Sequence, residues 1–352
     1  MKNQGIFLLL LGASISIAAC GTEEQNQDNT DNTEENESEP LQIYTTLYPW
    51  EEFTEIIGGD AVQVENLVPA GSDVHSFEPT AQTMVKIAES DAFIYNGAGM
   101  EGFADAVKDT AQQEGAATIE VTEELDLNTY DAHSHEETGE EDGHGSGEHE
   151  EEEHDHGNEN HGKEKNHEEE HDHNHDHGDQ DPHVWLDPLL AGEAAEKIKN
   201  ELIELRPENE EEFEENFNNL KTKLNSIHDQ FEEMAANTKN NTFLVSHAGY
   251  GYWEEKYGLH QIGISGLSPT NEPSQKQLQN IVQLAEENGI NHVMFEQNVS
   301  SKVAQLVQKE VGAEALYLHN LESLTEEDIA NDENYFTLMN KNIENLNEAL
   351  NY

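Results

Sequence analysis

Residues 131–181 limit what this chain can fold into, because they consist almost entirely of His, Asp, Glu, Gly and Asn. So few apolar side chains cannot form a core, and we expect a disordered insertion between two globular parts. Twelve of the chain's 19 histidines lie in this insertion, a composition typical of metal binding. The run HEEEH at 167–171 satisfies the H-E-x-x-H pattern of zinc proteases. That chemistry needs a helix with a buried apolar face, whereas the flanks here are KEKN and DHNHDH, so we interpret the match as chance.

The first 40 residues are expected to target and tether the protein. Residues 1–19 are predicted to be a lipoprotein signal peptide, since Lys2 precedes an apolar run from Ile6 to Ile17 that is shorter than a membrane span. The run continues into IAAC, which resembles a bacterial lipobox, and Cys20 is the chain's single cysteine. We expect a lipid on Cys20 and a position on the outer, extracellular face of the cytoplasmic membrane, as in a Gram-positive cell. Residues 20–40 are acidic and nearly without apolar side chains, which predicts a disordered acidic tether.

The balance of charge excludes one class of partner. The chain carries 76 Asp and Glu against 16 Lys and Arg, a formal net charge of −60. Nucleic acid needs a basic surface, so we expect no nucleic-acid partner. The single cysteine also excludes an intrachain disulfide framework and a cysteine-based zinc finger.

Outside these segments, predicted strands alternate with predicted helices in two similar halves. This alternation is typical of βα units with a parallel sheet. We expect an N-terminal α/β lobe at 41–206, a linking helix at 207–235 and a C-terminal α/β lobe at 236–352. The linking helix is long for one layer of a domain and would act as a strut between the lobes. The predicted strands are 41–47, 62–68, 92–95, 117–121, 242–246, 261–265, 292–296 and 315–318, and the predicted helices within the lobes are 49–57, 79–90, 101–113, 188–205, 250–257, 274–288, 300–311 and 334–350.

Three histidines outside the insertion fall where a cleft between two such lobes would lie. His75 is in a loop after the second predicted strand, His183 lies in the segment DPHVWLDP, and His247 follows the first strand of the second half. Ligands of open parallel sheets bind beyond the carboxyl ends of the strands, so we predict that these three histidines hold a metal. A fourth ligand has two candidates, Glu296 and Glu322. The other histidines outside the insertion are interpreted as structural or solvated; they are His228, His260, His292 and His319.

The chain contains, in this order, the segments LYPW, DVHSFEPT, NGAGMEGF, DPHVWLDP, SHAGYGYWEEKYGL, ISGLSPTNEPS and FEQNVSSKVA. Together they resemble the substrate-binding lipoproteins of bacterial zinc ABC importers, the ZnuA type of the metal-binding cluster A-I family. The resemblance implies two Rossmann-like lobes with parallel sheets, joined by a long rigid helix, with a metal site in the cleft between them. It implies metal ligands at His75, His183 and His247. The family's fourth ligand lies in an Asn-Pro-Leu-Glu type sequence, here HNLE at 319–322 without the proline. Glu322 is therefore preferred, and Glu296 is expected to shape the interlobe surface.

Three imidazoles and one carboxylate form a four-coordinate set that suits Zn²⁺ better than Mn²⁺ or Mg²⁺. A closed set favours carrying the metal over catalysis, so we expect no enzyme activity. The resemblance implies a protein that captures zinc outside the cell and delivers it to the permease of an ABC transporter, whose ATPase acts through the permease. We expect a lipid-anchored monomer. The alternatives are a manganese or other divalent-metal binder of the same family and a metal-dependent adhesin, while a surface zinc hydrolase is disfavoured.

The histidines of the insertion are expected to bind further zinc weakly, because each set of ligands must first order a flexible chain. These auxiliary positions are His133, His135, His144, His149, His154, His156, His161, His167, His171, His173, His175 and His177.

Overall fold

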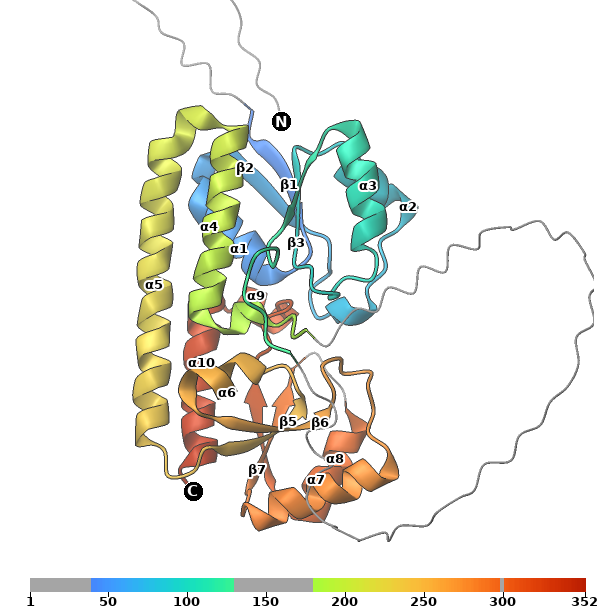
Figure 1. Cartoon of the computed structure of the whole chain (residues 1–352), viewed down its shortest axis with the longest axis vertical. Helices are drawn as coiled ribbons and strands as arrows, with labels where there is room; N and C mark the ends of the chain where they lie inside the picture. The colour runs from blue at the N-terminus through green and yellow to red at the C-terminus, as the bar shows by residue number, and fades with distance from the viewer. Residues whose placement is uncertain (1–38, 130–179, 298–300) are drawn as a thin grey trace, which may run out of the picture. The chain divides into compact units, whose positions relative to one another are not determined.

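Two four-stranded parallel sheets form the centres of two lobes in the computed structural model of the chain (Figure 1). The structure describes residues 39–129, 180–297 and 301–352, and all of these belong to one compact unit. The predicted signal peptide, the tether up to residue 38 and the insertion from 131 to 179 lie outside the described residues. The predicted fold class, two α/β lobes with parallel sheets joined by a long helix, is confirmed.

The N-terminal lobe alternates strands with helices as the sequence predicts. Its elements are β1 (Leu41–Thr45), α1 (Tyr48–Gly58), β2 (Val62–Asn66), α2 (Ala81–Ala88), β3 (Ala92–Tyr95), α3 (Ala104–Glu114), β4 (Ala117–Glu120) and α4 (Pro188–Leu205). The strands are parallel in the order β2-β1-β3-β4. Strand β3 reads AFIY and is buried throughout, as expected where helices cover both faces of a sheet. Helices α2 and α3 pack over Phe93 and Tyr95, while α1 packs against α4.

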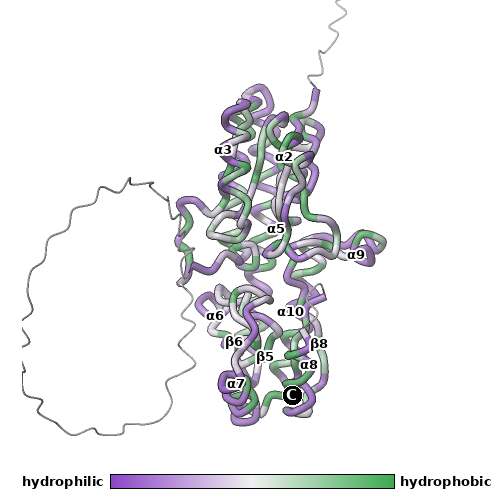
Figure 2. The backbone as a smooth tube through the Cα atoms, turned by 90° about the vertical axis from the view of Figure 1, so that its right-hand side faces the viewer, coloured by the Kyte–Doolittle hydropathy of each residue, from purple (hydrophilic) through white to green (hydrophobic). Residues whose placement is uncertain are grey.

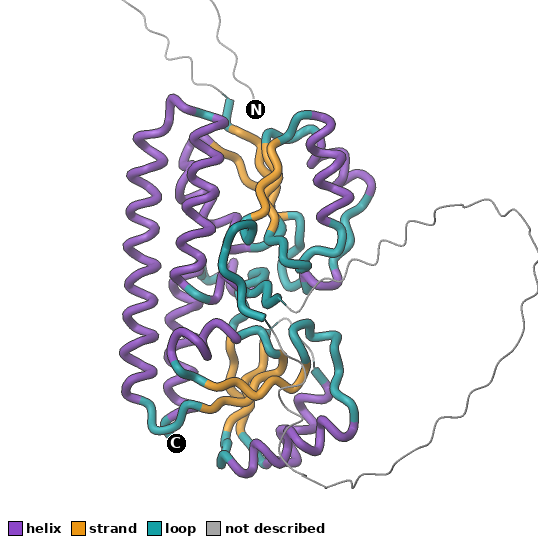
Figure 3. The backbone as a smooth tube through the Cα atoms, viewed as in Figure 1, coloured by secondary structure: helices purple, strands orange, loops and turns teal. Residues whose placement is uncertain are grey.

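The C-terminal lobe repeats this plan. Its elements are β5 (Thr242–His247), α6 (Gly251–Tyr257), β6 (His260–Ser265), α7 (Gln275–Glu287), β7 (His292–Glu296), α8 (Lys302–Val311), β8 (Glu314–Leu318), α9 (Glu326–Ala330) and α10 (Tyr335–Leu350). The parallel order is β6-β5-β7-β8, so each strand occupies the place of its counterpart in the first lobe. Figure 3 shows the strands of each lobe grouped together with helices beside them. The short helix α9 was not predicted. It begins at a capping box formed by Thr325 and Asp328.

A single long helix joins the two lobes. The 3₁₀ turn η4 (Pro207–Asn209) leads into α5 (Glu210–Asn237), whose 28 residues span about 42 Å. The predicted linking helix therefore begins three residues later than expected. Helix α5 packs against α1 and α4 of one lobe and against α6 and α10 of the other. Its apolar face joins a core cluster with members in both lobes, and hydrophobic positions recur along the helices in Figure 2. The buried residues of α5 are Phe213, Phe217, Leu220, Leu224, Ile227, Phe231 and Met234.

The segment that follows the insertion is fixed to both lobes. Gln180 forms an antiparallel bridge with Thr129, and the N–H of Asp181 donates to the carbonyl of Asn128 at 2.8 Å. The expectation that the insertion extends to residue 181 is thus wrong at its end, because Asp181 is buried and hydrogen-bonded. Trp185, in the 3₁₀ turn η3 (Val184–Leu186), is fully buried, and its Nε1 donates to a carbonyl of the C-terminal lobe.

Among the residues described, no helix has both the length and the apolar character needed to cross a membrane.

Candidate metal centre

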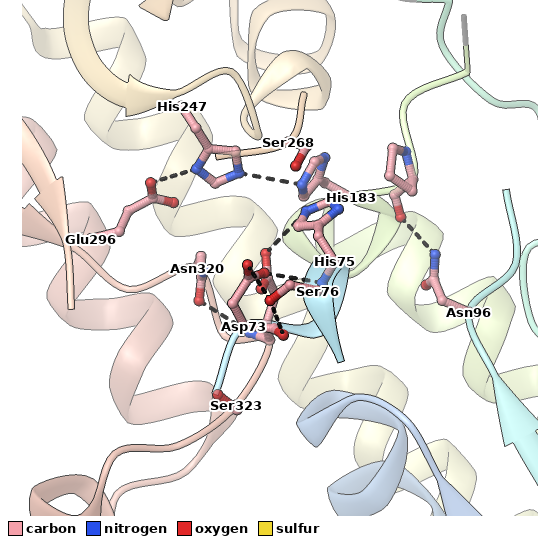
Figure 4. A network of polar contacts seen from close by, with 12 residues as sticks. Asp73, His75, Ser76, Asn96, His183, His247, Ser268, Glu296, Asn320 and Ser323 are labelled. Atoms are coloured by element: carbon pink, nitrogen blue, oxygen red, sulfur yellow. Dashed lines mark hydrogen bonds and ion pairs between the residues drawn. The ribbon is translucent and has the colours of Figure 1, made fainter. Parts of the chain in front are cut away.

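The structure brings together the four residues that the sequence predicts as ligands. Figure 4 shows the three histidines among them close together. His75 lies in the 3₁₀ turn η2 (Val74–Ser76) after β2, His183 directly precedes η3, and His247 is the last residue of β5. Glu322 lies four residues after β8. Each side chain offers one ligand atom, and these four atoms all lie within 4.8 Å of one another. Two ligands thus come from loops of the N-terminal lobe and two from the C-terminal lobe.

Three of the four residues each lie in a local turn of the same type. The N–H of His75 donates to Asp73 Oδ1 at 3.0 Å, and the N–H of His183 donates to Asp181 Oδ1 at 3.0 Å. The N–H of Glu322 donates to the side-chain oxygen of Asn320 at 3.2 Å. Each is an Asx turn, in which an Asp or Asn accepts a hydrogen bond from the backbone two residues later. The pattern Asp/Asn-x-ligand is visible in the sequence, but the role of its first residue was not predicted.

His247 is held instead by the sheet and by a buried carboxylate. Its Nδ1 is hydrogen-bonded to Glu296 Oε2, which also accepts a hydrogen bond from the hydroxyl of Ser246. The hydroxyl of Tyr250 donates to the other oxygen of Glu296 at 3.1 Å. Glu296 is 3% exposed and is bonded to these three residues of its own lobe, so it supports a predicted ligand instead of shaping the interlobe surface. It lies behind His247, on the side away from the cluster (Figure 4).

The carboxylates of Asp181 and Glu296 determine which ring nitrogen of His183 and of His247 is free. His183 Nδ1 lies 2.7 Å from Asp181 Oδ1, and His247 Nδ1 contacts Glu296 in the same way. An ionised carboxylate only accepts hydrogen bonds, so in both rings the proton lies on Nδ1. In the neutral rings Nε2 then carries a lone pair. The two Nε2 atoms lie 3.4 Å apart, so two lone pairs face each other, an arrangement that a cation between them would stabilise.

The remaining two ligand atoms lack hydrogen-bond partners within the described structure. His75 Nε2 and Glu322 Oε1 are both buried and unpaired, and they lie 3.7 Å apart. A buried polar atom without a partner is costly, and such atoms are expected where an ion binds. The side chain of His75 is 11% exposed and that of Glu322 is 2% exposed, so within this pair His75 lies nearer to solvent.

Burial and neighbouring charges shift the pKa values of three of the four groups. Burial, with the neighbouring His183 and His247, lowers the pKa of His75 to about 2. Burial raises the pKa of Glu322 to about 8, although His247 opposes this effect. For His247, burial acts to lower the pKa, but the charge and hydrogen bond of Glu296 outweigh it, and the pKa lies above its ordinary value. Without a cation, Glu322 therefore holds a proton near neutral pH, whereas His75 is neutral.

The four histidines interpreted as structural or solvated lie elsewhere. His228 of helix α5 contacts Tyr257 of helix α6, His260 pairs with Glu254, and His319 pairs with Asp328. His292 lies beside the ring of Tyr352. The structure thus places none of these four in the cluster. Cys20 and the twelve auxiliary histidines lie outside the described residues.

Two α/β lobes joined by a helix, with a buried set of ligand atoms between them, define the class of two-lobed substrate-binding proteins. The chain belongs to the ZnuA family, described as "Zinc-uptake complex component A periplasmic", whose model matches residues 43–349.

Relatives and solved structures agree with this assignment. The zinc-binding lipoprotein AdcA of Streptococcus pneumoniae (strain ATCC BAA-255 / R6) is 34% identical over 99% of this chain, but this chain spans only 61% of its length. The high-affinity zinc uptake system protein ZnuA of Bacillus subtilis (strain 168) is 31% identical, over 99% of this chain and 98% of its own. The crystal structure of the Zn(II)-bound ZnuA-like domain of Streptococcus pneumoniae AdcA superimposes with a TM-score of 0.67 at 31% identity, covering 89% of this chain and all of that domain.

Proposed function

We propose that this chain captures Zn²⁺ between its lobes and delivers it to the permease of an ABC transporter for zinc uptake. The observation that carries the proposal is the pair of imidazole Nε2 atoms of His183 and His247, 3.4 Å apart, each with its Nδ1 bound by a carboxylate. His75 and Glu322 complete a tetrad of three nitrogen atoms and one oxygen atom. Membership of a zinc-uptake family, and relatives whose names state zinc binding, support zinc as the cargo.

The ligand set favours zinc over harder cations. Zn²⁺ accepts imidazole and carboxylate in four-coordinate sites, whereas Mg²⁺, Ca²⁺ and Mn²⁺ prefer mostly oxygen ligands. Catalytic zinc normally keeps an open position for water. The four protein ligands proposed here would fill the coordination shell, which suits transport rather than catalysis.

The same proposal extends to location and partners. We propose that Cys20 carries a lipid that holds the protein at the outer face of the cytoplasmic membrane, where a monomer would meet the permease. The IAAC motif supports this, as does a relative named a lipoprotein. The ATPase would act through the permease, without direct contact.

The histidines of the insertion would act as weaker auxiliary sites. They alternate with carboxylates at 171–177 (HDHNHDH), and ordering the chain around each coordinating set would cost conformational entropy. The insertion precedes His183 in the sequence, so zinc gathered there would raise the local concentration near the tetrad.

The proposal is tested by metal analysis and competition titration of the full chain. Protein purified without added metal should contain zinc, and after stripping it should bind one equivalent tightly against a chelator of known affinity, with manganese binding far more weakly. His183→Ala should lose this equivalent. His260→Ala is the matched control, because His260 also pairs with a carboxylate but lies outside the cluster. Tight binding that survives His183→Ala would contradict the proposed site, and turnover of an ester or peptide by the zinc-loaded protein would favour a hydrolase.

A further inference from the structure

The turn that carries Glu322 contains a residue in an unfavourable backbone conformation. Leu321 has φ of +59° and is fully buried. The left-handed region disfavours residues with a Cβ atom, so such a residue persists only where its surroundings hold it. The conformation of Leu321 determines where the next residue lies, and the next residue is the proposed fourth ligand.

The peptide between Asn320 and Leu321 is held at both ends. Its carbonyl oxygen accepts a hydrogen bond from Trp185 Nε1 of the N-terminal lobe at 2.7 Å. Its N–H, which belongs to Leu321, donates to His319 Nδ1 at 3.0 Å. A peptide held at one end only can rotate about its flanking bonds, and such a rotation would change φ of Leu321. The imidazole therefore helps to fix the orientation of this peptide.

Both ring nitrogens of His319 and both of its backbone polar groups are hydrogen-bonded. Because Nδ1 accepts a hydrogen bond, the ring proton lies on Nε2, which donates to Asp328 Oδ2 at 3.1 Å. The same carboxylate oxygen accepts a hydrogen bond from the N–H of Thr325. Asn342 of helix α10 bonds the backbone of His319 twice, through its Oδ1 at 2.7 Å and its Nδ2 at 2.8 Å. His319 is 4% exposed.

We propose that His319 is a positioning residue for the metal site, which holds the Asn320–Leu321 peptide so that Glu322 points at the three imidazoles. It is not a ligand, since both of its ring nitrogens are already bonded and it lies outside the cluster. The inference rests on the proposed function, because it requires that Glu322 coordinates the zinc.

Two substitutions test the roles of the two ring nitrogens of His319 one at a time. The side-chain oxygen of Asn occupies the place of Nδ1, so His319→Asn keeps an acceptor for the N–H of Leu321 as an Asx turn. The side-chain nitrogen of Gln reaches the place of Nε2, so His319→Gln keeps the donor to Asp328 but loses the acceptor. Both variants remain polar and of similar size. His228→Ala serves as a control for a half-buried histidine that is remote from the tetrad.

The zinc affinity of the full chain is measured by chelator competition, with circular dichroism and thermal melting to confirm that each variant is folded. We expect His319→Gln to weaken the tight site about tenfold, the scale on which outer-shell partners affect metal affinity. His319→Asn should retain most of the affinity, and His228→Ala all of it. In a Glu322→Ala background, His319→Gln should have no further effect, since there is no longer a carboxylate to position.

Four results would overturn the inference. If His319→Gln lowers the melting temperature of a folded protein but leaves its zinc affinity unchanged, His319 is merely structural. Equal loss with and without Glu322 would mean that His319 acts elsewhere. Nitrogen-15 NMR of the unmodified chain, with the His319 signal assigned by its absence in His319→Asn, must show the proton on Nε2. A proton on Nδ1 would also exclude the proposed hydrogen bond. If Glu322→Ala itself leaves affinity unchanged, the fourth ligand of the proposed function is wrong, and with it this inference.

Discussion

The two lobes share a strand order but use the end of their first strand differently. In the N-terminal lobe, Thr46 follows β1, and its hydroxyl donates to the buried Glu101, which also accepts hydrogen bonds from the N–H groups of Asn96 and Gly97. In the C-terminal lobe, β5 ends in His247, whose Nδ1 is bonded to the buried Glu296. Both lobes therefore place a buried glutamate behind the end of the first strand.

The difference lies in what the glutamate holds. The hydrogen bonds of Glu101 lead only to groups of its own lobe, and its carboxylate completes a local network. Glu296 holds an imidazole whose second nitrogen faces the other lobe, 3.4 Å from a nitrogen of His183. One topology thus yields a structural network in one lobe and a candidate metal ligand in the other, because the site depends on particular side chains and not on the fold.

The largest effect is expected where the two lobes differ most. His247→Ala should abolish tight zinc binding, with a loss of at least about a hundredfold. Structural zinc sites with four ligands have apparent binding free energies of about 10–16 kcal/mol, so one ligand accounts for some 3 kcal/mol. Thr46→Ala changes the corresponding position of the other lobe and should lower only the melting temperature. Competition titration measures the affinity, and retention of the tight site in His247→Ala would remove the distinction between the lobes.

The two glutamates offer a matched pair of conservative substitutions. Glu296→Gln should weaken zinc binding by about 10- to 100-fold, because the amide no longer fixes the proton on Nδ1 of His247 and reduces the basicity of Nε2. Glu101→Gln places an amide N–H against one of three donors, so it should lower stability by about 1–3 kcal/mol with zinc affinity unchanged. Denaturant unfolding and zinc titration of both variants test this division. It would be contradicted if Glu101→Gln weakened zinc binding as much as Glu296→Gln does.

The lobes should also differ in how protons compete with the metal. The pKa of Glu322 is raised to about 8, so near neutral pH this group holds a proton that zinc must displace. The pKa of His247 is also raised, so protons compete with zinc for this ring at a higher pH than for an ordinary imidazole. His75, with its pKa lowered to about 2, holds none. Zinc affinity should therefore fall as pH falls below about 8, by roughly tenfold per unit for each proton displaced.

Chelator competition between pH 6 and 8.5 measures this slope. Glu296→Gln should make it shallower, because His247 loses the partner that raises its pKa. Affinity that does not change with pH between 8 and 6 would exclude Glu322 and His247 as the groups that release protons.

Much of the fold could be predicted because the apolar pattern is strong. The strands at 92–95 and 292–296 and the helix at 188–205 have the predicted bounds. Helix α9 was missed because its five residues are too few to show helical periodicity. The three histidines and Glu322 come together as predicted, although spacing alone left Glu296 as a rival. Periodicity carries no information on such long-range contacts, so the role of Glu296 behind His247 could not be predicted.

Asp181 shows a different limit of sequence reasoning. Its neighbours Gln180 and Asp179 resemble the insertion in composition, and only the tertiary structure shows that it pairs with His183. The signal that could have placed it is the Asp-Pro-His sequence, which repeats the spacing of Asp73 and His75. A pattern of one residue two positions before three of the four ligands is too short to stand out before the ligands are known.

The smallest effect concerns the connection that follows the fourth strand in each lobe. In the C-terminal lobe three residues separate β8 from Glu322, whereas in the N-terminal lobe the insertion separates β4 from His183. The described ends of that connection are already joined, since Thr129 pairs with Gln180 and Asn128 bonds Asp181. Replacing residues 131–179 by a short glycine-rich turn should therefore leave the affinity of the tight site within about threefold, because the entropy of closing a connection changes only slowly with its length. The same deletion should remove several weak zinc equivalents.

A deletion that extends two residues further provides the control. Removing 131–181 also removes Asp181, the hydrogen-bond partner of both the backbone and the ring of His183. It should weaken the tight site by about 10- to 100-fold, the range typical of outer-shell partners. Isothermal titration of the two deletion variants counts tight and weak equivalents separately. Equal loss of the tight site in both would mean that the insertion itself supplies a ligand, and the contrast between a short, fixed connection in one lobe and a long, dispensable one in the other would fail.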